Sequence, residues 1–285
     1  THSVQKSSLP VQPALLAERK SMIVRCSPDR NELNAWLEAS DIPPLPGAGK
    51  YQWKISTAND SAQFYFNQGI NAYYGFHIIE AMASFAKASR FDPECAMLYW
   101  AQALAYGPNI NDFGYIASPA ALDALEKANA FSGKASGFEK ALIAAISVRY
   151  VADSADATRK NLNESYTAKM EQVHLQFPGN ADAAVLYADA MMLEHPWDLW
   201  FTNGTPKPWT PRIRATLEKM LSKTPLHPGA NHYYIHVMEP SPFADRALPS
   251  AERLGITNPG LSHLVHMPSH IFLRTGHYQK GIDVN

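Results

Sequence analysis

The sequence predicts an all-α fold, in which helix pairs stack into a right-handed superhelix (an α–α solenoid) preceded by an N-terminal strap. From about residue 60 onward, apolar residues recur at spacings of three and four, the period of an amphipathic helix. Most breaks in this period contain Pro or Gly, which end helices. The chain shows no pair of alternating segments joined by a turn, as two antiparallel strands would require. The composition, 46% hydrophobic and 18% charged, is typical of a globular protein.

The chain divides into an N-terminal arm or strap, residues 1–59, and a helical domain, residues 60–285. The arm has no sustained period. Only residues 31–40 predict a short helix, and the proline-rich segment 43–47 predicts an extended linker. In the domain we expect helices at residues 60–75, 77–90, 94–107, 118–131, 136–150, 155–176, 181–194, 211–223, 229–239, 242–254 and 262–275.

Charge and cysteine content exclude several classes of protein. With 25 basic and 26 acidic residues, the net charge of −1 gives no basis for binding nucleic acid or an anionic membrane. No apolar run reaches the ~18–20 residues that span a bilayer. Cys26 and Cys95 alone form neither a disulfide framework nor a cysteine-type zinc motif. Thr1 is not an initiator Met and the last residues predict an unfinished helix, so we expect a piece truncated at its C-terminal end.

A repeat of about 34 residues is visible in the helical domain. It places small residues where two helices approach each other and aromatic residues beside them. The matching residues are Tyr65, Gly69, Ala81, Phe85, Ala88 and Pro93, followed one repeat later by Tyr99, Ala103 and Tyr106. This spacing resembles that of tetratricopeptide-repeat (TPR) proteins, which implies a right-handed superhelix that binds a peptide or protein partner in its concave groove.

A closer resemblance is to a bacterial group of TPR proteins with a histidine-rich second half. It covers roughly residues 60–285 and rests on the segments FHIIEA (76–81), DPECAM (92–97), GPNIN (107–111), HPW (195–197), HPGANHYYIH (227–236) and HLVHMPSHI (263–271). The resemblance implies no defined activity. Because such proteins are often exported, it implies an exported or periplasmic location.

Seven of the 11 histidines lie between residues 227 and 277. Among them, His232 and His236 stand at positions i and i+4, with Glu239 at i+7. On a helix with 3.6 residues per turn, these three side chains share one face. The sequence therefore predicts a helix face that carries two imidazoles and a carboxylate.

A second set consists of His263, His266 and His270, at positions i, i+3 and i+7. These side chains share one face if the segment is helical, but Pro268 removes a helical hydrogen bond. One alternative is a kinked helix that keeps the three histidines together. In the other, Pro268 is the first residue of a helix, and His263 and His266 lie on the loop before it.

Two such faces predict a metal site, because imidazoles that converge from neighbouring helices complete the ligand set of one ion. The helix expected at 242–254 would separate the faces in sequence and keep them close in space. Ligation by histidine without cysteine suits one or more ions of copper, zinc or iron. The alternative is that each histidine is a structural residue bonded to a main-chain carbonyl. The expected ligands are His232, His236, His266 and His270, followed by His263 and Glu239.

The chemistry at such a site is left open by the sequence. A zinc protease of the HExxH type is excluded, because Tyr233 occupies the place of the catalytic glutamate. Glu239, Tyr233 and Tyr234 are the only candidates for a catalytic role. Three functions remain: a metal-dependent oxidoreductase or hydrolase that acts on a small molecule, a non-enzymatic TPR scaffold for a peptide or protein, and metal storage or sensing.

An aromatic loop begins at the HPW segment. It contains Trp197, Trp200, Phe201 and Trp209, together with Gly204 and two prolines. This composition predicts a long ordered loop. It either covers the site as a lid or forms a plain packing cluster.

Overall fold

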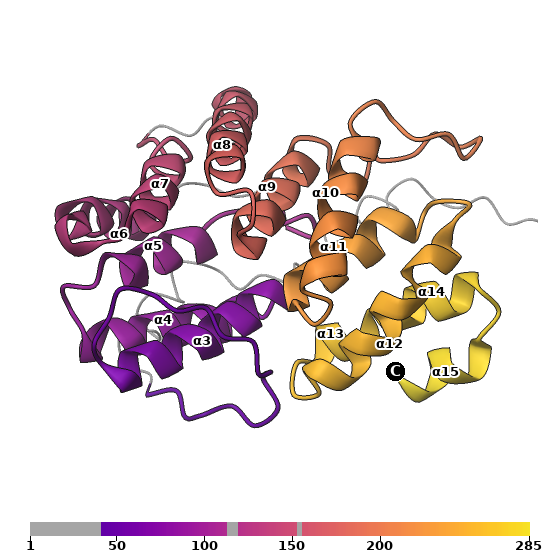
Figure 1. Cartoon of the computed structure of the whole chain (residues 1–285), viewed down its shortest axis with the longest axis horizontal. Helices are drawn as coiled ribbons and strands as arrows, with labels where there is room; N and C mark the ends of the chain where they lie inside the picture. Colours follow the sequence, from indigo (N-terminus) through magenta and orange to yellow (C-terminus); the bar gives the residue numbers. More distant parts are fainter. Residues whose placement is uncertain (1–40, 113–118, 153–155) are drawn as a thin grey trace, which may run out of the picture.

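The computed structural model describes residues 41–112, 119–152 and 156–285, and this part of the chain is helical, with no β-strand (Figure 1). The all-α class is therefore confirmed. The predicted helix at 31–40 lies outside the described residues. The α-helices are α3 (Asp60–Tyr74), α4 (Ile78–Phe91), α5 (Ala96–Ala105), α6 (Pro119–Ala130), α7 (Gly137–Ile146), α8 (Asp156–Gln176), α9 (Ala181–Glu194), α10 (Thr210–Lys223), α11 (Pro228–Met238), α12 (Leu248–Thr257), α13 (Ser262–His266), α14 (Pro268–Arg274) and α15 (Tyr278–Asp283). Short 3₁₀ turns, η1 (Ser132–Lys134) and η2 (Ala244–Ala247), precede α7 and α12.

Most helices begin within a few residues of the predicted positions because capping residues mark their starts. The side chains of Asn59 and Asn180 accept hydrogen bonds from backbone N–H groups in the first turns of α3 and α9. Ser136 and Glu139 form a capping box at the start of α7.

The helix expected at 242–254 begins later than predicted. Residues Ala244–Ala247 form the 3₁₀ turn η2, and the α-helix starts only at Leu248, with Pro249 in its first turn. Proline is tolerated there because the first N–H groups of a helix have no intrahelical partner. A pattern of apolar spacing alone does not reveal this change of register.

The pairing of α3 with α4 depends on a small residue, as the repeat spacing predicts. A Cβ atom added to Gly69 would lie 2.4 Å from Cε1 of Phe85, so the Phe85 ring packs directly on the backbone of α3. Ala81 is fully buried in the same contact region. Gly69 and Phe85 therefore fit each other as the small and aromatic partners of one helix pair.

The end of α3 also packs against helices from the far end of the chain (Figure 1). The Tyr74 ring lies against the backbone at Gly229 of α11, where an added Cβ would approach Cδ1 of Tyr74 to 2.4 Å. The next residue, Gly75, faces Leu261 and Leu264. In a simple solenoid each repeat touches only its neighbours. This contact between distant helices is an addition to that pattern, and the right-handed TPR superhelix stays a prediction.

The described part of the predicted strap, residues 41–59, contains no helix and lies across several helices. Gln68 of α3 accepts a hydrogen bond from the Leu45 N–H and donates one to the Pro43 carbonyl. Further along, the buried Trp53 ring packs edge-on against Trp100 of α5. This segment thus fixes α3 relative to the helices around it.

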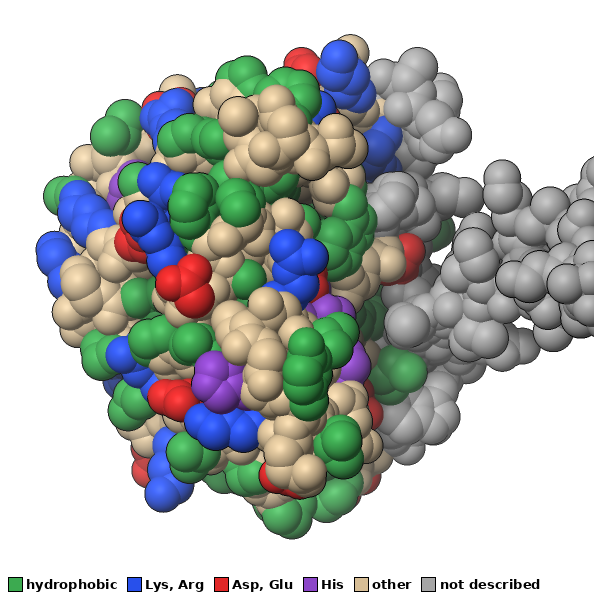
Figure 2. All heavy atoms as spheres, turned by 90° about the vertical axis from the view of Figure 1, so that its right-hand side faces the viewer, with side chains coloured by type: hydrophobic (Ala, Val, Ile, Leu, Met, Phe, Trp, Pro, Cys, Tyr) green, Lys and Arg blue, Asp and Glu red, His purple; other side chains and the backbone are tan. Residues whose placement is uncertain are grey.

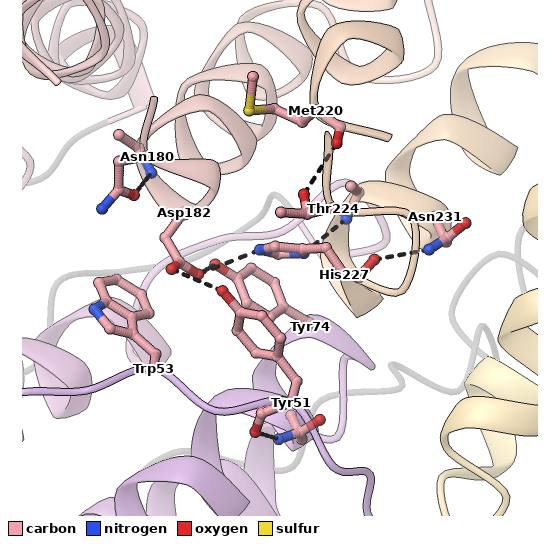
Figure 3. A network of polar contacts seen from close by, with 12 residues as sticks. Tyr51, Trp53, Tyr74, Asn180, Asp182, Met220, Thr224, His227 and Asn231 are labelled. Carbon is pink, nitrogen blue, oxygen red and sulfur yellow. Dashed lines mark hydrogen bonds and ion pairs between the residues drawn. The ribbon is translucent and has the colours of Figure 1, made fainter. Parts of the chain in front are cut away.

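A buried carboxylate joins the strap to three helices (Figure 3). Asp182 at the start of α9 accepts hydrogen bonds from the hydroxyls of Tyr51 and Tyr74, both at 2.8 Å. His227 Nε2 donates a third at 3.3 Å, while its Nδ1 accepts the Ala230 N–H and so caps α11. These bonds hold the N-terminus of α11, the helix that carries His232 and His236, against α3 and α9.

No helix in the described part is long and apolar enough to cross a membrane.

Candidate metal centre

Helix α11 carries two buried histidines on one face, as the sequence predicts. His232 is fully buried and His236 is 2% exposed. They lie one turn apart, so their rings are neighbours along the helix, with centroids 4.7 Å apart and ring planes tilted by 49°. Fully buried imidazoles are unusual unless both ring nitrogens find partners.

Three histidine nitrogens converge on one point. Nε2 of His232 lies 3.0 Å from Nε2 of His236 and 3.1 Å from Nε2 of His263 on α13. The ligand atoms of the three residues all lie within 4.8 Å of one another. Two nitrogens bound about 2.0–2.1 Å from a tetrahedral ion stand roughly 3.3 Å apart. The spacing therefore suits one ion held by His232, His236 and His263.

The outer nitrogens determine which tautomers are present. Nδ1 of His232 lies 2.6 Å from the carbonyl oxygen of Tyr74, and Nδ1 of His236 lies 3.1 Å from Oε1 of Glu239. Because a carbonyl and a carboxylate only accept, each Nδ1 carries the hydrogen and each Nε2 is a bare lone pair. Two lone pairs 3.0 Å apart repel unless a cation lies between them. Metal-bound histidines typically show this arrangement of a tethered Nδ1 and an inward Nε2.

Burial keeps these rings neutral. Removal from water, together with the neighbouring imidazoles of His236 and His263, lowers the pKa of His232 well below its ordinary value. Removal from water, followed by the neighbouring imidazoles of His236 and His266, lowers the pKa of His263 to about 3. Neutral imidazole is the form that binds a metal, so protons do not compete for this site near neutral pH.

Glu239 lies beside the cluster as a charged acceptor at the C-terminal end of α11. Its Oε1 accepts from Nδ1 of His236, and its Oε2 lies 2.6 Å from Nδ1 of His270 on α14. Burial alone would raise the pKa of Glu239, but the hydrogen bonds from both histidines lower it to about 2. The carboxylate thus orients two rings, and both its oxygens are used in doing so.

Two aromatic residues with unusual backbone conformations enclose the cluster. Phe76 has a φ of 55° and Trp197 a φ of 60°, the only positive values among non-glycine residues in the described ranges. The Phe76 ring lies 4.5 Å from that of His232, and the Trp197 ring 5.2 Å from that of His236. Such a conformation costs a bulky residue about 1–3 kcal/mol. Phe76 and Trp197, the two described residues with this conformation, therefore each place an aromatic ring against the histidine cluster.

The second predicted set of histidines divides between two places. Met267 has helical backbone angles (φ −51°, ψ −37°) and joins α13 to α14, so the segment is a helix broken at Pro268 and not a loop. Neither alternative for Pro268 holds in full: Pro268 is the first residue of α14, as in the second, but His263 and His266 lie on the short helix α13 and not on a loop. The change of direction turns His263 towards α11. His266 and His270 instead face each other, with Nε2 atoms 3.1 Å apart.

Neither tyrosine candidate donates its hydroxyl to the cluster in the described contacts. The Tyr234 hydroxyl donates to Glu218 of α10 at 2.8 Å. Tyr233 packs its ring against His232, but its hydroxyl, buried without a hydrogen-bond partner, has a pKa raised by burial and by the nearby Asp189 carboxylate. The Tyr233 hydroxyl therefore lies near Asp189 and takes no part in the hydrogen bonds of the histidine cluster.

Several residues of the site come from segments that sequence patterns did not connect with it. These are the Tyr74 carbonyl and the Phe76 ring. His77, which sequence reasoning allows as a remote ligand only if the superhelix curls back, lies beside the cluster, where its Nε2 accepts the backbone N–H of His263 at 3.3 Å. The aromatic loop was predicted as either a lid or a packing cluster. It contacts the site through Trp197, and the Trp200 indole donates to the Val237 carbonyl of α11 at 2.7 Å.

Comparison with known proteins assigns no family. No protein-family model matches the chain, and no curated protein matches it. The resemblance to TPR proteins accordingly stays a prediction. The function of the chain has to be inferred from the geometry of the histidines.

Proposed function

We propose that this protein binds a first-row transition-metal ion through the Nε2 atoms of His232, His236 and His263. The observation that carries the proposal is the pair of bare Nε2 atoms 3.0 Å apart on α11, each with its Nδ1–H held by an oxygen. His263 adds a third nitrogen at 3.1 Å. Neither a core packing role nor a hydrogen-bond network accounts for lone pairs directed at one another.

The donor set indicates the class of ion. Three neutral imidazoles without sulfur suit zinc, copper or iron and are poor ligands for magnesium or calcium. Three protein ligands leave at least one coordination position for water or a small molecule, as in catalytic metal sites. An ion held in this way lowers the pKa of bound water and polarises a bound oxygen. A metal-dependent oxidoreductase or hydrolase acting on a small molecule is the activity that this arrangement supports.

Elemental analysis of protein purified without a histidine tag tests the proposal. We expect at least one equivalent of zinc, copper or iron per chain, lost in the variant His232→Ala/His236→Ala. The exposed His277, outside the cluster, supplies the control variant His277→Ala. Since both helix histidines are buried, His263→Ala serves as a second, half-buried substitution that leaves α11 intact. Metal content equal in all four proteins would overturn the proposal.

A further inference from the structure

A second pair of histidines repeats the arrangement of the first at the edge of the fold. Nε2 of His266 lies 3.1 Å from Nε2 of His270, across the break at Met267. The two residues stand at i and i+4, the spacing at which histidines on one helix bind a single ion. Figure 2 shows the face made by the C-terminal helices, where histidine side chains reach the surface.

Both rings of this pair are tethered through their outer nitrogens. Nδ1 of His270 lies 2.6 Å from Oε2 of Glu239, and Nδ1 of His266 lies 2.5 Å from Oδ1 of Asn285. Since both oxygens accept, each Nδ1 carries the hydrogen and the two Nε2 lone pairs face each other. The tethers come from the C-cap of α11 and from the second residue after α15, so two separate elements aim these rings at one point.

We propose that His266 and His270 hold a second divalent first-row metal ion, which makes the histidine cluster a two-metal centre. This inference deepens the proposed function, because Glu239 connects the sites: it holds His236 of the first through Oε1 and His270 of the second through Oε2. The His263 and His266 rings, one from each site, have centroids 6.4 Å apart.

The two sites differ in their access to water. The rings of Phe76 and Trp197 pack against the first site. At the second site His266 is exposed and His270 is half-buried. The second ion therefore takes two imidazoles and completes its coordination with solvent or a small anionic ligand. Fewer protein ligands make this the weaker site and the one that exchanges its ion more readily. The Glu239 carboxylate, which contacts one ring of each site, would offset part of the repulsion between two bound ions.

Metal titration of the full chain tests the second site. Tag-free protein, stripped with a chelator, is titrated with Zn²⁺ against a competing chromophoric chelator. We expect two ions per chain for the wild type and for His277→Ala, and one ion, bound with unchanged affinity, for His266→Ala. The exposed position of His266 makes that variant safe for folding. Equal stoichiometry in the wild type and in His266→Ala would overturn the inference, as would weak binding that His277→Ala reduces to the same extent.

Electron paramagnetic resonance with Cu²⁺ as the probe distinguishes two neighbouring ions from scattered surface binding. Two ions at adjacent sites couple magnetically, so the spectrum at two equivalents is expected to broaden in the wild type and not in His266→Ala. An uncoupled spectrum in the wild type would contradict a two-metal centre. The variants also separate the two proposals. Binding of two ions by His232→Ala would disprove the first site, and binding of two ions by His266→Ala would disprove only the second.

Discussion

The Nδ1 atom of His232 lies 2.6 Å from the carbonyl oxygen of Tyr74, although the two residues stand 158 positions apart in the sequence. Tyr74 is the last residue of α3, where backbone carbonyls have no intrahelical partner. The end of one helix thus fixes the tautomer of a histidine on another. The geometry of the candidate metal centre therefore depends on the contact between α3 and α11 as well as on the histidines themselves.

Gly229→Ala should disturb this contact. The added Cβ would lie 2.4 Å from Cδ1 of the buried Tyr74 ring, so α11 must shift away from α3. We expect a loss of about 1–3 kcal/mol in the free energy of unfolding, as for other overpacked cores. Metal affinity should fall as well. Urea denaturation of the metal-free protein and a Zn²⁺ titration measure the two effects.

Gly137→Ala is the matched control for that substitution. Gly137 begins α7 and has open space around its Cα, so an alanine fits without contact. Its effect on stability should be neutral or slightly favourable. Equal stability losses in the two variants would show that Gly229 has no special role in the contact between α3 and α11.

Glu239→Gln should weaken metal binding without removing a ligand. The substitution replaces one of the two accepting oxygens with an NH₂ group, which cannot accept the Nδ1–H of His236 or of His270. Loss of such an outer partner typically lowers metal affinity about 10–100-fold. Competition titration with Zn²⁺ gives this ratio. An unchanged affinity would mean that the carboxylate does not orient the ligands.

The fluorescence of Trp197 should decrease when Cu²⁺ binds at the proposed site. The Trp197 ring lies 5.2 Å from that of His236, within reach of quenching by a bound Cu²⁺ ion. We expect tryptophan fluorescence to fall at the first equivalent, and this fall to shrink strongly in Trp197→Phe. Trp209→Phe is the control, because Trp209 stacks on His195 instead. Quenching that depends equally on both indoles would place the copper elsewhere.

Asp189 should make stability depend on pH. The side chain is 1% exposed, and burial raises its pKa to about 7, an effect that Arg149 and the Tyr73 hydroxyl only partly offset. Between about pH 4 and 7 the folded chain then binds a proton that the unfolded chain releases. The free energy of unfolding should fall as pH rises through this window, by up to roughly 1.4 kcal/mol per pH unit.

Asp189→Asn isolates this contribution, because the amide does not titrate. Denaturation of both proteins at several pH values should give a smaller decrease with rising pH for the variant, whatever its absolute stability. Parallel curves across the window would contradict a raised pKa at Asp189.

Local periodicity was enough to predict the part of the site that lies within one helix. His232 and His236 share a face of α11 because they stand four residues apart, and the structure places them so. The break at Pro268 was visible too, but its consequence was not. Whether His263 joins His266 or His236 depends on the direction that the chain takes at Met267 and on the packing of α12.

The remaining contributions could not be predicted from the sequence, because they arise from contacts between distant segments. Phe76 occupies the left-handed position that ends α3, where its N–H bonds to the Tyr73 carbonyl and the His77 N–H bonds to the Ala72 carbonyl. Glycine is the usual residue at that position, so a phenylalanine there does not indicate a positive φ. The Tyr74 carbonyl carries no signature at all. The roles of such groups become visible only when both ends of the helical domain are brought together.

The contact between α3 and the C-terminal helices also has a consequence for the synthesis and folding of the chain. During synthesis α3 leaves the ribosome long before α11 and α13, so no nascent fragment contains the complete pocket. Contacts of such sequence separation form late in folding. Metal binding at the proposed site would therefore be a late step, because it requires that the first helices of the domain have already packed against the last.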